Sequence, residues 1–205
     1  MRFPHGYLGW RKANSPKGSE PPEIPKLGAG DYFPSCRLYL LKHAEDRKYL
    51  EIRHNRRTFS LEDVESEYLF IEIYNEMCYG CLAEVVNYKA FYRVLNGDDL
   101  LRDQVRMIGI GVGSKKRIVA KFRKEKNIPF PLFADEKRKI FKSLGKPLLP
   151  TSYLVRRLPD GGRRIIFVQS GHIDSLEKLV QKVCSGGVQK LSECSERFFA
   201  CHSPY

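Results

Sequence analysis

The residues with the clearest chemistry in this chain are two cysteines separated by two residues, in Cys78-Tyr79-Gly80-Cys81. A run of β-branched and aromatic residues ends just before them, and apolar residues at helical spacing follow. Two cysteines at this spacing at a helix start can approach within disulfide geometry. The helix dipole and unpaired backbone N–H groups favour a thiolate at the first cysteine. A nucleophilic thiol with a resolving thiol one turn later predicts reversible dithiol–disulfide exchange.

Two other interpretations of the cysteine pair remain open. A CxxC pair is also half of a tetrahedral zinc or iron–sulfur site. The other half would come from Cys184 and Cys194 with Cys201 or His202. Nine residues separate Cys184 from Cys194, whereas about two to four are typical of a metal site. The pair could also be structural or incidental, and the position between a strand and a helix favours redox exchange over both alternatives.

Glu72 is the second candidate for chemistry, because it interrupts an apolar strand pattern. It alternates with Phe70 and Tyr74 among apolar neighbours, six residues before Cys78. This spacing predicts that its carboxylate points into the interior. A buried carboxylic acid has a raised pKa and can take a proton from a resolving thiol. The alternative is a carboxylate that pairs with a basic residue on a face of the sheet.

The elements that must position these residues follow from hydrophobic periodicity and from turn residues. From residue 67 the expected order of elements is strand, helix, strand, helix and helix, followed by a β-hairpin of two strands and a last helix. Helices between the early strands imply parallel pairing, and the late hairpin adds antiparallel strands. The fold class is therefore α/β, with a mixed central sheet and helices on both faces. The expected strands are 37–41, 48–52, 67–74, 104–112, 151–156 and 164–168, and the expected helices are 79–95, 114–126, 135–145 and 175–183.

Ser114 and Asp135 are the expected caps of the second and third helices. The strands at 37–41 and 48–52 form an N-terminal β extension to the sheet. Residues 1–35, rich in Pro and Gly, are expected to be a flexible arm. The folded domain spans 36–184, and a Cys-bearing tail covers 185–205.

Composition excludes several classes of protein. The chain has 205 residues, of which 42% are hydrophobic, and this apolar content is too high for a fully disordered chain. No apolar stretch approaches the roughly 20 residues that cross a bilayer. Six cysteines are too dilute for a disulfide scaffold. The net charge is +12, but the basic residues are scattered, which favours solvated faces over nucleic-acid binding.

The first 30 residues contain no apolar core of a signal peptide. The chain as written is therefore expected in the cytoplasm. An export segment upstream of Met1 would instead make the protein periplasmic or membrane-anchored.

The motif and its surroundings resemble a known family. Residues 67–81 resemble the active-site strand of thioredoxin-like proteins, and more closely that of the redoxin family. That family contains thiol–disulfide oxidoreductases of the cytochrome-maturation type and the alkyl hydroperoxide reductase and peroxiredoxin group. The resemblance covers roughly residues 56–183 and implies a thioredoxin-like fold. The other matching segments are 58–64, 107–112, 130–135, 142–145, 149–155 and Gly171.

The resemblance implies a role for each matching residue. Cys78 is the attacking thiol and Cys81 the resolving thiol. Pro150 is the cis-proline that faces them and lets the backbone of residue 149 pair with a bound substrate chain. A trans proline at a strand entry is the alternative at that position. Glu72 matches the buried carboxylate of thioredoxins.

Four positions depart from the pattern of relatives. Met77 stands where thioredoxins usually have Trp, and the residues between the cysteines are Tyr79 and Gly80, with neither Pro nor His. Asn75 lies where peroxiredoxins carry a Thr or Ser, so the hydroxyl that would hold a peroxide is missing.

The sequence therefore predicts a thiol–disulfide oxidoreductase that uses the Cys78 and Cys81 dithiol on protein disulfides. Its partners are protein disulfide or dithiol substrates and an unidentified thiol electron donor or acceptor. No cofactor, metal, nucleic acid or membrane span is expected. The alternatives are a thiol peroxidase that uses Cys78 and a non-catalytic interaction module of the same fold.

Overall fold

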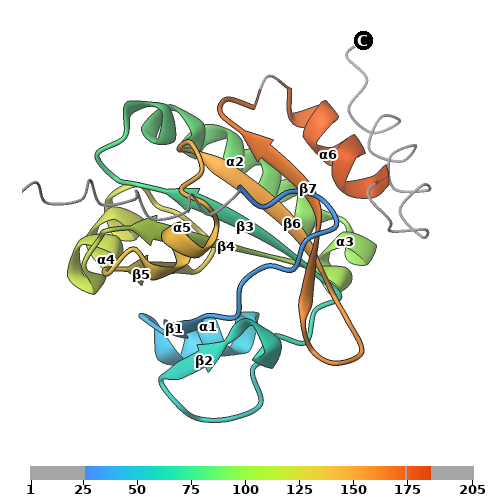
Figure 1. The fold of residues 1–205 in the computed structure, drawn as a ribbon, viewed down its shortest axis with the longest axis horizontal. Coiled ribbons are helices and arrows are strands. Elements are labelled where there is room, and N and C mark those ends of the chain that lie inside the picture. The colour runs from blue at the N-terminus through green and yellow to red at the C-terminus, as the bar shows by residue number, and fades with distance from the viewer. Residues whose placement is uncertain (1–25, 174, 186–205) are drawn as a thin grey trace, which may run out of the picture.

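The computed structural model of the chain describes residues 26–173 and 175–185 (Figure 1). A five-stranded mixed sheet forms its centre, in the order β5-β4-β3-β6-β7. The first three are parallel, whereas β6 runs antiparallel to β3 and β7 antiparallel to β6. This arrangement confirms the predicted mixed sheet. The strands are β3 (Tyr68–Tyr74), β4 (Val105–Val112), β5 (Leu132–Asp135), β6 (Thr151–Arg157) and β7 (Arg163–Ser170).

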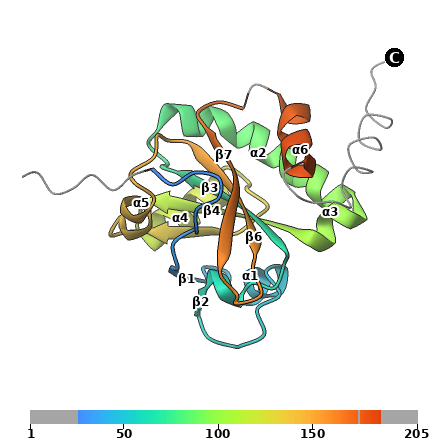
Figure 2. The ribbon, with the colours of Figure 1, turned by 45° about the vertical axis from the view of Figure 1, so that its right-hand side comes forward.

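Helices cover one face of the sheet, as the alternation of β3 requires. Phe70, Glu72 and Tyr74 point to this face, which carries α2 (Tyr79–Gly97), α3 (Asp99–Gln104), α4 (Lys116–Glu125) and α6 (Leu176–Ser185). Figures 1 and 2 show α6 beside α2. All seven side chains of β3 are buried, as expected of a central strand that is covered on both faces.

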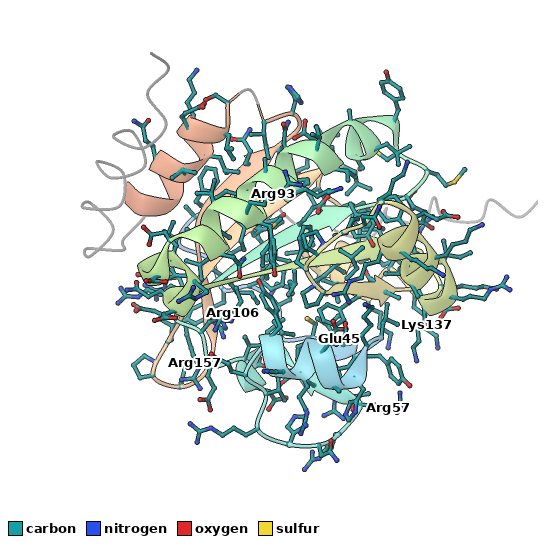
Figure 3. All side chains as sticks on the ribbon, turned by 180° about the vertical axis from the view of Figure 1, so that it is seen from behind. Glu45, Arg57, Arg93, Arg106, Lys137 and Arg157 are labelled. Carbon is teal, nitrogen blue, oxygen red and sulfur yellow. The ribbon has the colours of Figure 1, made fainter. Side chains whose placement is uncertain are left out.

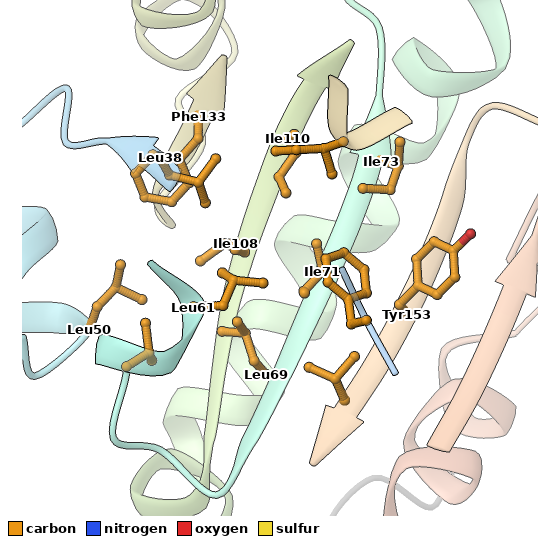
Figure 4. Packing of buried hydrophobic residues seen from close by; sticks show 14 of the residues in the cluster. Leu38, Leu50, Leu61, Leu69, Ile71, Ile73, Ile108, Ile110, Phe133 and Tyr153 are labelled. Carbon is orange, nitrogen blue, oxygen red and sulfur yellow. The ribbon is translucent and has the colours of Figure 1, made fainter. Parts of the chain in front are cut away.

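The opposite face packs against α5 (Lys139–Ser143) and the N-terminal segments. Figure 4 shows this apolar layer, in which Leu38, Leu50 and Leu61 meet side chains of the sheet. Ile71 and Tyr153 are its sheet-side members near the middle. Because this layer is apolar, the polar groups of interest lie on the other face of the sheet, which α2 covers.

Of the two strands expected in the N-terminal extension, 37–41 and 48–52, only the first forms. It pairs with a strand at 58–60 in a short two-stranded sheet. Antiparallel β1 (Arg37–Tyr39) and β2 (Thr58–Ser60) flank α1 (His43–Tyr49), and a 3-10 turn, η1 (Leu61–Asp63), follows. The predicted strand at 48–52 is therefore wrong. Leu50 and Ile52 are buried, but they lie in the turn that ends α1. Alternation over five residues does not distinguish a strand from a helix end with two inward side chains.

Two helix starts also differ from the predictions. Ser114 does not cap α4, because its hydroxyl donates to the carboxylate of Glu76 and Lys115 is the N-cap residue. Asp135 does bond to α5, whose Lys139 and Phe141 N–H groups donate to its two carboxylate oxygens at 2.8 and 2.9 Å. That helix nevertheless starts four residues later than expected.

The described part of the predicted arm, residues 26–35, packs along β7. The N–H groups of Gly30 and Phe33 each donate to a β7 carbonyl at 2.8 Å, those of Ile165 and Arg163. Phe33 is buried among the apolar residues of the extension. Within the ranges that the structure describes, no helix combines the length and the apolar character needed to cross a bilayer.

Candidate active site

The loop between β3 and α2 is held by one side chain, Asn75. Its Nδ2 donates to the carbonyl of Val112 on β4 at 2.8 Å, and its Oδ1 accepts from the N–H of Met77 at 2.8 Å. Its own carbonyl accepts from the N–H of Cys78 at 3.1 Å. Asn75 therefore ties the start of α2 to the end of the neighbouring parallel strand.

Cys78 is the N-cap residue of α2, so its sulfur takes the place that a serine or aspartate oxygen usually fills. The N–H of Cys81 donates to Cys78 Sγ at 3.3 Å, and the N–H of Leu82 donates to the Cys78 carbonyl at 3.0 Å. A donor aimed at the sulfur and the positive end of a 19-residue helix both stabilise a thiolate.

The loop before β6 faces Cys78 across the site. Cys78 Sγ lies 3.7 Å from the carbonyl oxygen of Leu149, and the Leu149–Pro150 peptide bond is cis, as the resemblance implies. A Cβ atom built on Gly80 would lie 3.5 Å from Pro150 Cδ and 4.0 Å from Cys78 Sγ. The turn of the CxxC motif thus packs directly against the proline.

Cys81 lies one turn deeper and is a free thiol, as is Cys78. Its residue is 1% exposed, whereas Cys78 is half-buried. Burial raises the pKa of the Cys81 thiol well above its ordinary value, and the hydrogen bond with Cys78 and the charge of Glu72 act in the same direction. The two thiols therefore differ in access to solvent, and the surroundings of Cys81 favour its protonated form.

Glu72 is buried on the face of β3 that α2 covers, as its alternation predicts. It lies opposite Ser152 in the β3–β6 register. Burial raises the pKa of Glu72 well above its ordinary value, and the negative charge of Glu84 raises it further. Among the described residues no cation forms an ion pair with Glu72, so the alternative of a surface ion pair is not seen.

Glu84 is a residue of this site that the sequence analysis did not single out. It is fully buried on α2. Its carboxylate accepts from Asn87 Nδ2 at 3.1 Å and contacts Nδ1 of His172, in the loop after β7. The spacing was available in the sequence, because Glu84 follows Cys81 by three residues on the buried stripe of the helix. The contact with His172 was not, since 88 positions separate the two residues.

A neutral hydrogen bond completes the polar layer between α2 and the sheet. The hydroxyl groups of Tyr88 and Ser152 are 2.8 Å apart. Both lie beside Glu72, since Ser152 is its register partner and the charge of Glu72 helps to raise the pKa of Tyr88. Four polar side chains, from two strands and one helix, thus surround the inner side of the cysteine pair.

The outer side of the pair is apolar and open to solvent. Met77 and Tyr79, which flank Cys78, are 85% and 87% exposed, and Leu148 across the site is 69% exposed. Exposed large apolar side chains that gather at one place indicate an interaction surface. Access to Cys78 is thus open from this side.

The metal alternative has no support in the described ranges. Between residues 26 and 185, residue 174 aside, no group of three or more His, Cys, Asp or Glu side chains is placed to hold a metal ion. Cys194, Cys201 and His202, three of the residues named for the second half-site, lie outside the described residues.

Comparison with known proteins agrees with the predicted family and fold. Residues 42–158 match the model of the AhpC/TSA family. No curated protein matches the chain. A putative thiol:disulfide interchange protein DsbE from Chlorobium tepidum is similar at a TM-score of 0.59 and 16% identity, over 78% of this chain and 99% of that one.

Two further solved structures give the same picture. A putative protein disulfide isomerase from Bacteroides thetaiotaomicron aligns at a TM-score of 0.59 and 16% identity, over 83% of this chain and 99% of that one. AhpC from Mycobacterium tuberculosis aligns at a TM-score of 0.55 and 18% identity, over 78% of this chain and 97% of that one. At these identities the likeness shows the fold, and the expected thioredoxin-like fold is confirmed.

Proposed function

The chain belongs to the AhpC/TSA family, and we propose that it is a thiol–disulfide oxidoreductase that exchanges its Cys78/Cys81 dithiol with disulfides of protein substrates. The observation that carries the proposal is the unequal placement of the two thiols. Cys78 Sγ caps a helix N-terminus, receives the Cys81 N–H and is reachable from solvent. Cys81 is buried one turn deeper beside a buried acid.

In the first step, the Cys78 thiolate attacks one sulfur of the substrate disulfide. The substrate S–S bond breaks, a Cys78–substrate mixed disulfide forms, and the second substrate sulfur leaves as a thiolate that takes a proton from water. The Leu149 carbonyl, 3.7 Å from Cys78 Sγ, is placed to accept an N–H of the substrate backbone. The exposed side chains of Met77, Tyr79 and Leu148 supply apolar contact around the reacting sulfurs.

In the second step, Cys81 loses its proton to the Glu72 carboxylate and attacks Cys78 Sγ. The mixed disulfide breaks, the substrate sulfur leaves as a thiolate that takes a proton from water, and Glu72 returns its proton to the solvent. A Cys78–Cys81 disulfide then holds the oxidised state. Burial raises the pKa of Glu72, which makes its carboxylate a stronger acceptor for the proton of the Cys81 thiol. A thiol electron donor then returns two electrons to the pair.

A thiol peroxidase that uses Cys78 is the second candidate. The similarity to an AhpC structure favours it. The position that carries a hydroxyl in peroxiredoxins is Asn75, whose amide is already bonded to Met77 and Val112. A peroxide therefore lacks that donor, and we rank disulfide exchange first.

The test is reduction of insulin disulfides by the protein with dithiothreitol, beside consumption of hydrogen peroxide. We expect insulin reduction that Cys78→Ser abolishes, while Cys81→Ser traps a mixed disulfide detectable by mass spectrometry. Cys36→Ser, which alters a thiol on the opposite face of the sheet, is the control. Peroxide consumption without insulin reduction would favour the peroxidase, and the absence of both activities in the wild-type protein would favour a non-catalytic module.

A further inference from the structure

Beyond the cysteines, the solvent side of α2 carries an ordered pattern that the exchange chemistry does not use. Tyr79, Leu82, Val86, Lys89 and Arg93 recur at intervals of three and four residues, so they lie along one side of the helix. We call these five residues the outer stripe of α2. Its half nearest Cys78 is apolar and exposed, and its far half is cationic.

A groove runs beside this stripe, between α2 and the end of α4. Its volume is about 440 Å³. The α2 side supplies an apolar lining near the cysteines, and cations lie at the far end. The lining residues are Leu82, Ala83, Val85, Val86, Lys89, Arg93, Glu125 and Lys126.

The charges at the far end leave an unbalanced positive potential. Glu125 is the acid of the groove, and Lys121 Nζ lies 3.6 Å from its carboxylate. Lys89 Nζ donates to the carbonyl of Lys126 at 3.1 Å, which keeps the ammonium at the rim without neutralising it. Among the described residues no acidic side chain pairs with Arg93, which Figure 3 shows on α2. An acidic segment is the complementary partner for this end.

The distance from Cys78 sets where the acidic residues must lie. A helix rises about 1.5 Å per residue, so Lys89 lies about 16 Å and Arg93 about 22 Å from Cys78 along α2. An extended chain covers about 3.3 Å per residue. A substrate segment that runs along the stripe from Cys78 therefore reaches these cations about five and seven residues from its own cysteine.

We propose that the outer stripe of α2 binds the chain segment next to the substrate's reacting cysteine, and that the partner is a disulfide-bearing protein with an apolar stretch beside that cysteine and acidic residues five to seven positions away. The inference rests on the proposed exchange function and adds the class of substrate. The apolar half of the stripe shields the reacting sulfurs from water, and the cationic half sets the direction of the segment.

The test compares two peptides of identical composition, each with one cysteine held as a mixed disulfide with 2-mercaptoethanol. One has aspartates five to seven residues from the cysteine on both sides, and the other has them adjacent to it. Reduced protein should reduce the first with a kcat/KM about threefold higher at low salt, as expected for exposed charge pairs. The difference should disappear at about 0.5 M salt.

Charge reversal on the stripe supplies the decisive variant. Arg93→Glu should remove the preference and favour a peptide with lysines at the same positions. Arg57→Glu changes the net charge equally at an exposed site away from α2 in Figure 3 and should keep the preference. A preference that survives in Arg93→Glu, or that Arg57→Glu also removes, would overturn the inference.

Two further measurements separate this inference from the exchange function. Bis(2-hydroxyethyl) disulfide is small and neutral, so all three proteins should reduce it equally, and no reduction by any would refute the exchange function alone. Peptides with Ser in place of Cys, followed by fluorescence anisotropy, report the groove without redox chemistry. Equal binding of both Ser peptides, or tighter binding of a single-stranded DNA oligomer, would overturn the acidic-substrate assignment.

Discussion

Cys78 and Cys81 differ in their access to water, and the proposed proton transfer to Glu72 depends on this difference. The Cys81 thiol is buried and its pKa is raised, so its attack depends on a neighbouring base. Glu72 is the buried carboxylate on the same face of the sheet, with a pKa that burial also raises. A raised pKa makes the Glu72 carboxylate a stronger proton acceptor than an exposed glutamate.

Glu72→Gln tests this assignment. The variant keeps the shape of the side chain but cannot accept the proton, so the resolving step should slow on the order of 100-fold at neutral pH. The first attack by Cys78 should be nearly unchanged. Single-turnover kinetics of the mixed disulfide measure both steps, and an unchanged lifetime would contradict the role.

The same variant should also be more stable than wild type, by an amount that depends on pH. A carboxyl whose pKa is raised in the folded state contributes stability at low pH that is lost as the pH rises through the folded value. The melting temperature of Glu72→Gln should therefore match that of wild type near pH 4.5 and exceed it increasingly at higher pH. The corresponding gain in the free energy of unfolding should be about 1–3 kcal/mol.

Glu84 acts on Glu72 through its charge. Because that charge raises the pKa of Glu72, Glu84→Gln should lower it. The pH dependence of the resolving step should then move to lower pH. Asn87→Ala removes a hydrogen bond to Glu84 but not the charge, and it should leave the pH profile in place. A profile that shifts equally in both variants would point to a general disturbance of α2.

Among the helices, α1 and α4 are joined by a buried ion pair. Arg123 Nη1 lies 2.7 Å from Asp46 Oδ1, and these side chains are 10% and 1% exposed. The other oxygen of Asp46 accepts the N–H of Lys42 at 3.0 Å, at the start of α1. The pair holds α1 (His43–Tyr49) against α4, and the last two residues of α1 overlap the strand predicted at 48–52.

Loss of one member of the pair should be costly. Asp46→Ala leaves the guanidinium of Arg123 buried without its partner and should lower the free energy of unfolding by about 3–5 kcal/mol. Urea denaturation measures this change. Glu45→Ala, next to it on the solvent side of α1, should remain close to wild type. Equal effects of the two variants would show that the buried pair adds nothing to stability.

In the molecule as a whole, Arg163 connects the N-terminal extension to the hairpin of β6 and β7. Its side chain is buried, and it donates to the carbonyl of Leu61 at 3.3 Å, to that of Ser66 at 2.8 Å and to that of Val64. Burial, and then the charge of Arg157, lower the pKa of Arg163 to about 10. One guanidinium thus satisfies three backbone carbonyls that have no access to water.

Arg163→Met should release the extension. The carbonyls of Val64 and Ser66 would lose this donor, at a cost of about 3–5 kcal/mol, whereas the Leu61 carbonyl keeps the N–H of Val64. The exposed arginines of residues 53–57 should then be cleaved by trypsin faster than in wild type. Arg163→Lys should rescue little, because an ammonium lacks the fork of donors that reaches several carbonyls. Unchanged cleavage in Arg163→Met would show that the apolar layer alone holds the extension.

Much of the site could be read from the sequence because its parts are neighbours along the chain. The run from Glu72 to Cys81 contains the strand, the loop and the helix start, and each has a local pattern of side chains. Burial of Glu72 follows from the two-residue period of a strand, which needs no knowledge of its partners. Pro150 was placed by resemblance, since nothing in its own neighbourhood specifies a cis bond.

Tertiary structure alone decided how residues far apart in the chain meet. The contact of Glu84 with His172, the ion pair of Asp46 with Arg123 and the groove between α2 and α4 each join separate elements. Periodicity tells which side of an element is buried, but not which polar group lies across from it. The strand predicted at 48–52 shows the same limit, because its alternation marked Leu50 and Ile52 as buried but not the helix end in which Leu50 lies or the long-range contact of Asp46 with Arg123.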